Sequence, residues 1–405
     1  MNCRHCKNPL KFTFLDLGFA PPSNAYLSKE ELNFQEVYFP LKINICDQCW
    51  LVQTEDYTKA ETLFTSKYAY FSSTSSSWLL HAKDYSDKII KELNLNETSY
   101  VIEVASNDGY LLKNFVNANI PCLGIEPTDS TAEAAEKLGI PVIRKFFGEN
   151  LGKQIAIQHT KADLIIGNNV FAHVPDINDF TKGLKAVLKK SGTINLEFHH
   201  LLNLINHDQF DTIYHEHFSY LSLNTVIKIF AASGLRIWHV EELTTHGGSL
   251  RVYGCHEEDP RKTESSVMKL IQKENHYKLN VIQTYADFQS RIDKIKDKLL
   301  NFLIEQKQDG KKVMAYGAAA KGNTLLNYAG IKPDLLSSIV DGAKSKQGKY
   351  MPGSHIPIID PESIKDLKPD CIIILPWNIH EEIKEMIVTL FSNKINLISI
   401  NDFKS

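Results

Sequence analysis

The chain has 405 residues, a formal net charge of −3 at neutral pH and 43% hydrophobic residues. This length and apolar content predict two or three domains with packed cores. The sequence contains no long basic block and no apolar run of about 18 residues, which argues against nucleic-acid binding and against a membrane span.

The N-terminus reads MNCRHCKNPL, a polar stretch without the apolar core of a signal peptide, so we expect a cytoplasmic protein. Two C-x-x-C pairs are present, Cys3 with Cys6 and Cys46 with Cys49. Two such pairs complete a closed thiolate site for a structural Zn²⁺, which leaves no position for a substrate. Disulfides are the alternative, but a cytosolic compartment disfavours them. A redox role is disfavoured because neither pair opens a βαβ unit.

Residues 1–70 are predicted to form this zinc-binding domain, which is rich in turns such as Ala20-Pro21-Pro22-Ser23-Asn24. The polar aromatic stretch KYAYFSSTSSSW (67–78) follows and precedes a helical run. Its serines suit a plain linker as well as a functional loop, and the sequence leaves both interpretations open.

From residue 98 the sequence alternates short apolar strands with helical stretches. The strands are SYVIEV (99–104), CLGIEP (122–127), ADLIIGNN (162–169) and GTINLEF (192–198), and the helices are 110–118, 130–138 and 177–190. This alternation predicts a mostly parallel, doubly wound α/β sheet. Two later strands, RIWHV (236–240) and SLRVYGC (249–255), would extend it.

The first of these strands ends in a turn, Ala105 to Gly109, that leads into a helix and presents backbone N–H groups to a ligand. Glu126 ends the next strand, 23 residues after Glu103, where a carboxylate can accept hydrogen bonds from both hydroxyls of a ribose. The turn lacks G-x-G-x-x-G, so a dinucleotide fits poorly and S-adenosylmethionine fits better. Glu103 can equally serve only to orient the turn.

The heptad YHEHFSY, Tyr214 to Tyr220, concentrates two histidines, a glutamate and two tyrosines. A second metal site is disfavoured, because H-E-x-x-H needs histidines four apart, whereas His215 and His217 are two apart. In an extended segment they would share a face, and His199-His200 would have to assist as ligands. A polar strand without chemistry and a proton-transfer site are the two remaining interpretations.

A long charged helical segment, 264–309, comes next, and the strand–helix alternation then restarts. The predicted strands are KVMAYG (312–317), LSSIVD (336–341), CIIILP (371–376) and NLISI (396–400). The chain therefore holds a second α/β unit.

The stretch YGAAAKGNTLLN (316–327) in this second unit suits a phosphate, because its glycines allow close approach and Lys321 adds charge at a helix N-terminus. Asp341 ends the next strand, 24 residues after Gly317, which by itself would suggest NAD. However, G-x-G-x-x-G is again missing, and three lysines crowd the following loop: Lys344, Lys346 and Lys349. Such a cluster suits phosphates outside a crevice. A helix-capping turn with solvated lysines is the alternative.

Taken together, E-V-A-S-N-D-G, G-I-E-P, N-N-V-F-A-H-V and Y-H-E-H-F-S-Y after a Cys₄ module resemble the sugar C-methyltransferases of deoxysugar biosynthesis. The resemblance covers nearly the whole chain. It implies an S-adenosylmethionine-dependent enzyme acting on a nucleotide-linked 4-keto-6-deoxysugar. The turn departs from methyltransferases in general, since only Gly109 of the usual glycines is kept, but it has the form expected within this family.

The resemblance also implies a division of the chain. A zinc-binding domain (1–70) would precede a class I, Rossmann-like methyltransferase domain (71–245), and a second Rossmann-like α/β domain (246–405) would hold the nucleotide-sugar. The residues that it assigns to the cofactor are Ala105, Ser106, Asn107, Gly109, Glu126, Pro127 and Phe147, with Asn168 nearby.

The proton-transfer interpretation of the heptad follows from the implied chemistry. Methylation at a sugar carbon requires an adjacent ketone that stabilises an enolate, a base beside the carbon, and donors facing the ketone oxygen. Histidine, with an ordinary pKa near ~6.5, is the natural base at neutral pH. The resemblance maps the base onto His217 and supporting roles onto Tyr214, Glu216 and Tyr68. Candidates for substrate contacts are Tyr70, Asn169, His173, Lys321, Asn323, Tyr350, Trp377 and Asn378.

The sequence therefore predicts a C-methyltransferase that acts next to the ketone of a 4-keto-6-deoxysugar, dTDP-linked by resemblance. Methylation at C-3 is favoured and C-5 remains open. The rival is a non-catalytic nucleotide-sugar or NAD-binding protein, which would not need the base of the heptad. We further expect a monomer that binds neither nucleic acid nor membrane.

Overall fold

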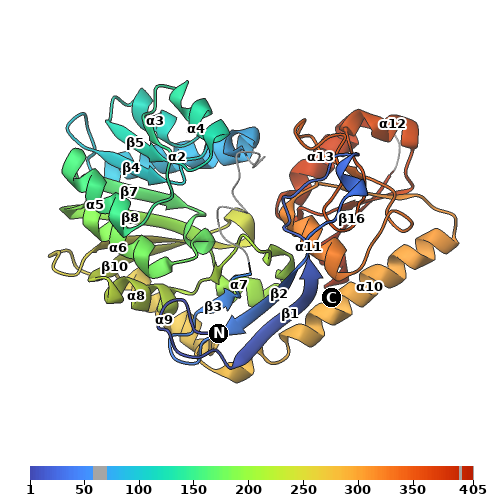
Figure 1. Ribbon diagram of the computed structural model, residues 1–405, viewed down its shortest axis with the longest axis horizontal. Coiled ribbons are helices and arrows are strands. Elements are labelled where there is room, and N and C mark those ends of the chain that lie inside the picture. Colours follow the sequence, from blue (N-terminus) through green and yellow to red (C-terminus); the bar gives the residue numbers. More distant parts are fainter. Residues whose placement is uncertain (58–70, 392–394, 405) are drawn as a thin grey trace. The chain divides into compact units, whose positions relative to one another are not determined.

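The computed structural model describes residues 1–57, 71–391 and 395–404 (Figure 1). The chain forms two compact units, each built from three separate stretches. The first unit comprises Met1–Phe12, Ile45–Leu202 and His217–Ile282. The second comprises Thr13–Asn44, Asn203–Glu216 and Gln283–Ser405. The chain passes from the second unit back to the first between Glu216 and His217, in the middle of the heptad.

The first unit contains a seven-stranded sheet in the order β10-β11-β8-β7-β4-β5-β6. Its strands are β4 (Val101–Val104), β5 (Cys122–Ile125), β6 (Val142–Ile143), β7 (Ala162–Asn168), β8 (Leu188–His199), β10 (Leu235–Leu243) and β11 (Ser249–His256). Strands β8, β7, β4, β5 and β6 are parallel, and β11 and β10 form an antiparallel edge. The predicted doubly wound sheet and its extension by two later strands are confirmed.

Helices cover both faces of this sheet, because successive strand residues point to opposite faces and apolar residues occur on both. On β7, Leu164 and Ile166 belong to a core with helices α2 and α3, whereas Ile165 belongs to a core with α5 and α6. The helices are α2 (Ser76–Glu92), α3 (Leu112–Asn117), α4 (Asp129–Glu136), α5 (Glu149–Gln158), α6 (Ile177–Val187), α8 (Leu223–Ala232) and α9 (Ser265–His276). Helix α5 and the short strand β6 were not among the elements predicted from the sequence.

The N-terminal cysteines pack as part of the first unit. Strand β3 (Val52–Thr54) pairs antiparallel with β9 (Ser219–Tyr220), so that Gln53 is opposite Ser219. Three of the four cysteines share an apolar core with the residues of the large sheet. This pairing brings the end of the cysteine region beside the second half of the heptad.

The second unit contains a five-stranded parallel sheet in the order β14-β13-β12-β15-β16. Its strands are β12 (Val313–Tyr316), β13 (Ile339–Val340), β14 (Ile358–Ile359), β15 (Cys371–Ile374) and β16 (Asn396–Ser399). Its helices are α10 (Phe288–Gln308), α11 (Ala320–Tyr328), α12 (Ile364–Leu367) and α13 (His380–Leu390). The predicted second α/β sheet is confirmed.

The remaining elements are short or lie where the chain changes unit. Strands β1 (Phe12–Ala20) and β2 (Phe39–Ile45) belong mostly to the second unit, and α7 (Leu201–Asn206) begins where the chain leaves the first. The short 3₁₀ helices that carry residues discussed below are η2 (Ser72–Thr74), η3 (Phe171–His173), η4 (Phe210–Thr212), η5 (Thr245–Gly247) and η8 (Trp377–Ile379).

The single helical segment predicted for 264–309 is wrong, because α9 ends at His276 and α10 begins at Phe288. Lys278 has a left-handed backbone (φ 55°), and the N–H of Leu279 donates to the carbonyl of Glu274, 3.2 Å away. This is a Schellman ending, formed here without the glycine that would have marked it in the sequence. No helix in the described ranges is long and apolar enough to cross a membrane.

Candidate active site and zinc centre

The four cysteines of the C-x-x-C pairs lie together, with their Sγ atoms all within 4.8 Å of one another. Cys3 and Cys49 Sγ are 3.5 Å apart, and Cys6 and Cys46 Sγ are 3.4 Å apart. A tetrahedral site with Zn–S bonds of about 2.3 Å needs Sγ atoms about 3.8 Å apart, whereas a disulfide needs about 2.0 Å. The quartet therefore fits Zn²⁺ and does not consist of disulfides.

The surroundings of the quartet also suit a metal thiolate. The amide of Gln53 donates to the Cys3 Sγ, 3.3 Å away, as partners of a ligand do around a bound metal. The hydrogen bond with Cys49 lowers the pKa of the Cys3 thiol to about 4, against the opposing effect of burial. With four protein ligands, a zinc ion here is structural.

The cofactor turn after β4 has the backbone conformation that a glycine-rich turn would have. Ala105 (φ 58°), Asn107 (φ 49°) and Gly109 (φ 77°) are all left-handed. Asn tolerates this region, and Ala does so only at a cost in strain. A Cβ on Gly109 would lie 2.5 Å from Ile140 Cδ1 and 3.1 Å from Ala135 Cβ, so a side chain there would also crowd these two residues.

Glu126 at the end of β5 holds this turn. Its carboxylate accepts the N–H of Asn107 (3.1 Å) and that of Thr128 (2.9 Å). Burial raises its pKa, and the bonds from Thr128 and Asn107 oppose that rise. Glu126 therefore has a structural role in the turn in addition to any contact with a ribose.

Glu103 is fully buried, and neither of its carboxylate oxygens has a hydrogen-bond partner among the described residues. Burial, with the nearby charges of Asp108 and Glu126, raises its pKa well above the usual range. No hydrogen bond from Glu103 to the turn is present in the described part of the chain, so its predicted orienting role gains no support.

Two other polar side chains, at the carboxyl ends of β4 and β7, lack hydrogen-bond partners within the described residues. The Ser106 hydroxyl and both amide atoms of Asn168, at the end of β7, are buried without hydrogen bonds. Buried polar groups cost free energy unless a partner is supplied, so these atoms fit a polar ligand such as S-adenosylmethionine. Of the other residues assigned to the cofactor, Pro127 is half-buried, and the ring of Phe147 packs edge-on against Phe180 at 5.4 Å.

The turn is also bonded to the segment that precedes α2. Asn107 Oδ1 accepts the N–H of Ser72 (2.9 Å), and Asp108 Oδ2 accepts the N–H of Ser73 (3.0 Å). The sequence analysis did not single out Asp108, although it belongs to the quoted A-S-N-D-G turn. Tyr68 and Tyr70, which were assigned to catalysis and substrate binding, lie outside the described residues.

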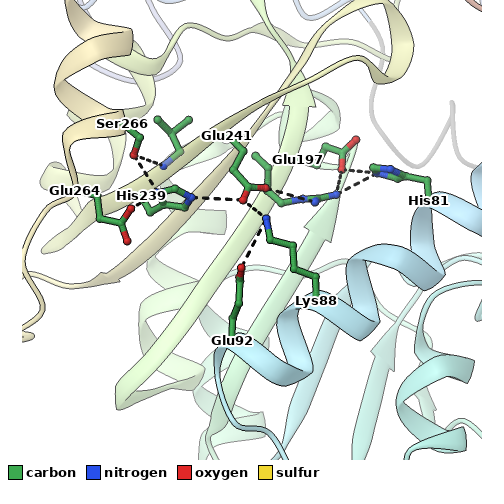
Figure 2. A network of polar contacts seen from close by, with 10 residues as sticks. His81, Lys88, Glu92, Glu197, His239, Glu241, Glu264 and Ser266 are labelled. Atoms are coloured by element: carbon green, nitrogen blue, oxygen red, sulfur yellow. Dashed lines mark hydrogen bonds and ion pairs between the residues drawn. The ribbon is translucent and has the colours of Figure 1, made fainter.

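A charged network that the sequence analysis missed lies at the end of β8 (Figure 2). The buried Glu197 accepts hydrogen bonds from Arg251 (2.5 Å) and Thr245 (2.7 Å), and its Oε2 lies 3.0 Å from His81 Nε2. Although burial would raise it, the hydrogen bond with His81 and the charge of Arg251 lower the pKa of Glu197 to about 2. The network extends through Glu241 to Lys88 and His239.

This network borders the edge that carries the cofactor turn. Glu197 pairs in register with Asn168, and its carbonyl accepts the N–H of Asn169, 2.7 Å away. Asn169 has a left-handed backbone (φ 52°), which turns the chain at the end of β7. A single charged residue in the apolar stretch GTINLEF was the only signal for Glu197 in the sequence.

His217 and His173 lie beside each other in the first unit. Their rings are 4.5 Å apart between centroids and meet edge to face, and both side chains are half-buried. The carbonyl of His217 accepts from Thr54 Oγ1 (3.3 Å), and the N–H of Phe218 donates to the carbonyl of Ala172 (2.8 Å). Residues predicted from two separate motifs are thus brought together.

The first half of the heptad belongs to the second unit. Glu216 is 1% exposed, and its Oε1 accepts from the amide of Asn24 (3.1 Å). Burial raises its pKa, and its Oε2 has no partner among the described residues. His215 is buried with its ring 6.0 Å from that of Phe39, and Tyr214 is half-buried.

Three of the residues assigned to the nucleotide form a cluster in the second unit, because Lys321 contacts both Trp377 and Asn378. Lys321 donates to Asn378 Oδ1 (3.0 Å), and its Nζ lies 4.5 Å from the centroid of the Trp377 ring. Burial lowers the pKa of Lys321 to about 8. Asn323 is fully buried, and its amide has no partner in the described part of the chain.

Two residues of this cluster were not predicted. Asp211 on η4 accepts from the indole N–H of Trp377 (2.6 Å), and burial raises its pKa. The Nζ of Lys404 lies 4.9 Å from the centroid of the Trp377 ring, which Lys321 also contacts. Neither residue stands in a recognisable motif, so only the fold reveals them.

The other predicted features of the second unit are engaged in local structure. Asp341 accepts the N–H groups of Ala318 and Ala343, each at 2.8 Å, and pairs with Lys346 at 3.2 Å. These bonds leave its carboxylate largely occupied, which disfavours the NAD interpretation. Tyr350 exchanges backbone hydrogen bonds with Leu27.

Family models match three consecutive parts of the chain. They describe a zinc binding domain (residues 3–64), a methyltransferase domain (residues 78–240) and a C-methyltransferase C-terminal domain (residues 244–399). A relative, the C-methyltransferase NovU of Streptomyces niveus, is 32% identical over 381 residues, which is 94% of this chain and 90% of the relative.

Solved structures resemble part of the chain. A SAM-dependent methyltransferase from Anabaena variabilis aligns with 44% of this chain and 85% of its own, with a TM-score of 0.36 and 16% identity. Magnesium protoporphyrin IX methyltransferase (ChlM) from Synechocystis, with bound SAH, aligns with 44% of this chain and 82% of its own, with a TM-score of 0.35 and 13% identity.

Proposed function

Because the chain belongs to the S-adenosylmethionine-dependent C-methyltransferases with an N-terminal zinc-binding domain, we propose that it methylates a nucleotide-linked 4-keto-6-deoxysugar. The methylated carbon is the one next to the ketone, with C-3 favoured over C-5. The observation that carries this proposal is the pairing of His217 with His173 in the unit that also contains the cofactor turn.

His217 takes the proton from the sugar carbon. The C–H electron pair moves into the adjacent ketone, whose oxygen becomes an enolate oxygen that Tyr214 stabilises by donating a hydrogen bond. S-adenosylmethionine, when bound, supplies a methyl group on a positively charged sulfur. The enolate carbon would take this methyl group, and S-adenosylhomocysteine would leave with the electron pair of the sulfur–carbon bond.

Glu216 and His173, which both precede His217 in the sequence, assist this step. The buried Glu216 has one carboxylate oxygen without a partner among the described residues, which suits a hydrogen bond to a sugar hydroxyl. The edge-to-face contact with His173 limits the orientations open to the His217 ring. Positioning the base against the carbon accounts for much of the rate in such a reaction.

The nucleotide-diphosphate part binds at the Lys321 cluster of the second unit. Lys321 supplies a cation, Asn323 supplies an amide that lacks a partner among the described residues, and Trp377 supplies an aromatic face. Phosphate recognition by a half-buried cation beside a helix N-terminus has this composition. Asn378 and Tyr350 remain candidates, and dTDP is the proposed nucleotide.

Incubation with dTDP-4-keto-6-deoxyglucose and S-adenosylmethionine tests the proposal. Mass spectrometry should show one added methyl group, and NMR of the product should place it on C-3. A product methylated at C-5 would change the proposed position of methylation and leave the proposed substrate class unchanged. Binding of S-adenosylhomocysteine without methylation of any nucleotide-linked 4-ketosugar would contradict the substrate class.

The division into domains 1–70, 71–245 and 246–405, the cytoplasmic location and the monomeric state stay predictions. Light scattering at several protein concentrations tests the monomer. Limited proteolysis tests the division, because exposed linkers between domains are cleaved first.

A further inference from the structure

Arg4 stands between the first two cysteines of the quartet, yet its side chain reaches away from them. It is 5% exposed, and its backbone N–H donates to Gln53 Oε1 (2.8 Å). The guanidinium donates to the carbonyls of Pro175 (2.7 Å) and Thr54 (2.9 Å), and to Asp56 Oδ1 (2.8 Å). It also lies over the Phe218 ring, 5.4 Å from the centroid.

One of these acceptors, Pro175, lies on the segment that carries His173, and another, Thr54, lies on the strand that is bonded to the segment of His217. Pro175 follows His173 by two residues on the same loop. Thr54 is bonded to the heptad, because its Oγ1 donates to the His217 carbonyl (3.3 Å) and its N–H donates to the Phe218 carbonyl (3.2 Å). One buried side chain therefore connects the backbone beside His173 to the backbone beside His217.

We propose that Arg4 is a positioning residue for the His173–His217 pair, and that the zinc-bound loop serves the reaction by holding Arg4 in place. This inference rests on the proposed role of His217 as the base. Arginine suits the task, because its planar fork carries several donors at fixed angles and can satisfy two carbonyls and a carboxylate together. Lysine carries a point charge on a flexible stem and cannot hold all three.

A second link between the same loop and the sheet provides a matched control. The Asn178 amide donates to the His5 carbonyl (2.9 Å), and its Oδ1 lies 2.7 Å from His5 Nδ1. This link docks the loop onto the start of α6 but touches neither Pro175 nor Thr54 in the described contacts. Asn178→Ala removes this link together with a 3.5 Å contact from the Asn178 amide to the Arg4 carbonyl, and it leaves the contacts of the Arg4 guanidinium in place.

The experiment compares Arg4→Gln, Arg4→Lys and Asn178→Ala with the wild type in the full chain. Elemental analysis measures the zinc content, and calorimetry measures the affinity for S-adenosylhomocysteine. The constants kcat and KM are measured with dTDP-4-keto-6-deoxyglucose as the substrate. NMR follows the ring signals of His173 and His217. For Arg4→Gln we expect retained zinc, unchanged affinity and a fall in kcat of about 10- to 100-fold, as misplaced catalytic groups cause. The ring signals should move.

Arg4→Lys should lose less activity than Arg4→Gln, and Asn178→Ala should keep both kcat and the ring signals. An equal loss in Asn178→Ala would overturn the proposal, because docking of the loop would then be the whole role. Loss of zinc in both Arg4 variants would also overturn it, because Arg4 would then serve the metal site. Unchanged ring signals together with a normal kcat in Arg4→Gln would also overturn the proposal. If His217 proves dispensable for turnover, the proposed base fails, while the NMR comparison still decides whether Arg4 positions the pair.

Discussion

The ring of His217 meets the ring of His173 edge to face, with 4.5 Å between the centroids, although the two residues come from motifs 44 positions apart. Each ring limits the orientations that are open to the other. This contact makes the role of His217 the first property to test.

His217→Asn should bind S-adenosylhomocysteine normally and lose turnover by at least about 100-fold, because a general base contributes about 10²–10⁴ in rate. The loss should appear in kcat, since the base acts only at the chemical step. His215→Asn, in the same heptad, is the matched control and should keep turnover. In D₂O with S-adenosylhomocysteine, the wild type should exchange the C-3 proton of the sugar and His217→Asn should not. Near wild-type turnover in His217→Asn would move the base to another residue.

Glu126→Ala should weaken S-adenosylmethionine binding by about 1.5–3 kcal/mol, the loss expected for hydrogen bonds to a charged group. The loss has two sources, because Glu126 accepts the N–H of Asn107 as well as facing the expected ribose site. Glu126→Gln keeps an acceptor oxygen for the turn and should lose less. Calorimetry measures both variants, and equal affinity in Glu126→Ala and wild type would remove Glu126 from the site.

One equivalent of zinc per chain is expected at the cysteine quartet. Cys46→Ser combined with Cys49→Ser should abolish it, because half of the ligand set is removed. Cys371→Ala, a buried cysteine outside the quartet, should retain it. Elemental analysis of purified protein decides, and full zinc stoichiometry in the double variant would contradict the assignment.

The free energy of unfolding should depend on acid pH through Glu197. Its pKa is lowered from 4.5 to about 2 in the folded protein, so its stabilising contribution is fully present above pH 4.5 and is lost as the pH falls toward 2. The contribution is on the order of 3 kcal/mol, at about 1.4 kcal/mol per pKa unit. Urea unfolding of wild type and Glu197→Gln from pH 7 downward should show a difference that shrinks below pH 4.5. A pH-independent difference would mean that the carboxylate charge is not what stabilises the network.

Binding of dTDP should weaken as the pH rises from 7 to 9, because Lys321 has a pKa of about 8 and is a cation only below it. Lys321→Met should bind weakly at both pH values, and Lys344→Ala, an exposed lysine of the neighbouring loop, should behave as wild type. Calorimetric titration at the two pH values measures the effect. A pH dependence that survives in Lys321→Met would assign it to another group.

The sequence was sufficient for features that depend on nearby residues. The turn Ala105 to Gly109 and the order of strands and helices follow from local alternation and spacing, and the cysteine quartet follows from two short C-x-x-C pairs. The left-handed conformation of Ala105 and Asn107 was not predicted and is seen only in the structure. Chain geometry constrains such features within a few residues, so a pattern suffices to predict them.

Other features depend on partners that the sequence does not specify. Glu197 is paired with Arg251, 54 positions away, and with His81, 116 positions away. The heptad looks like one motif, yet Glu216 and His217 belong to different units. Arg4 reads as a residue between two zinc ligands, but its guanidinium is bonded to the loop after His173 and to Thr54, which is itself bonded to His217. The sequence by itself determined which chemistry this protein carries. Only the tertiary structure decided which residues hold that chemistry in place, because buried charges take their partners from segments that the topology of the sheet brings together.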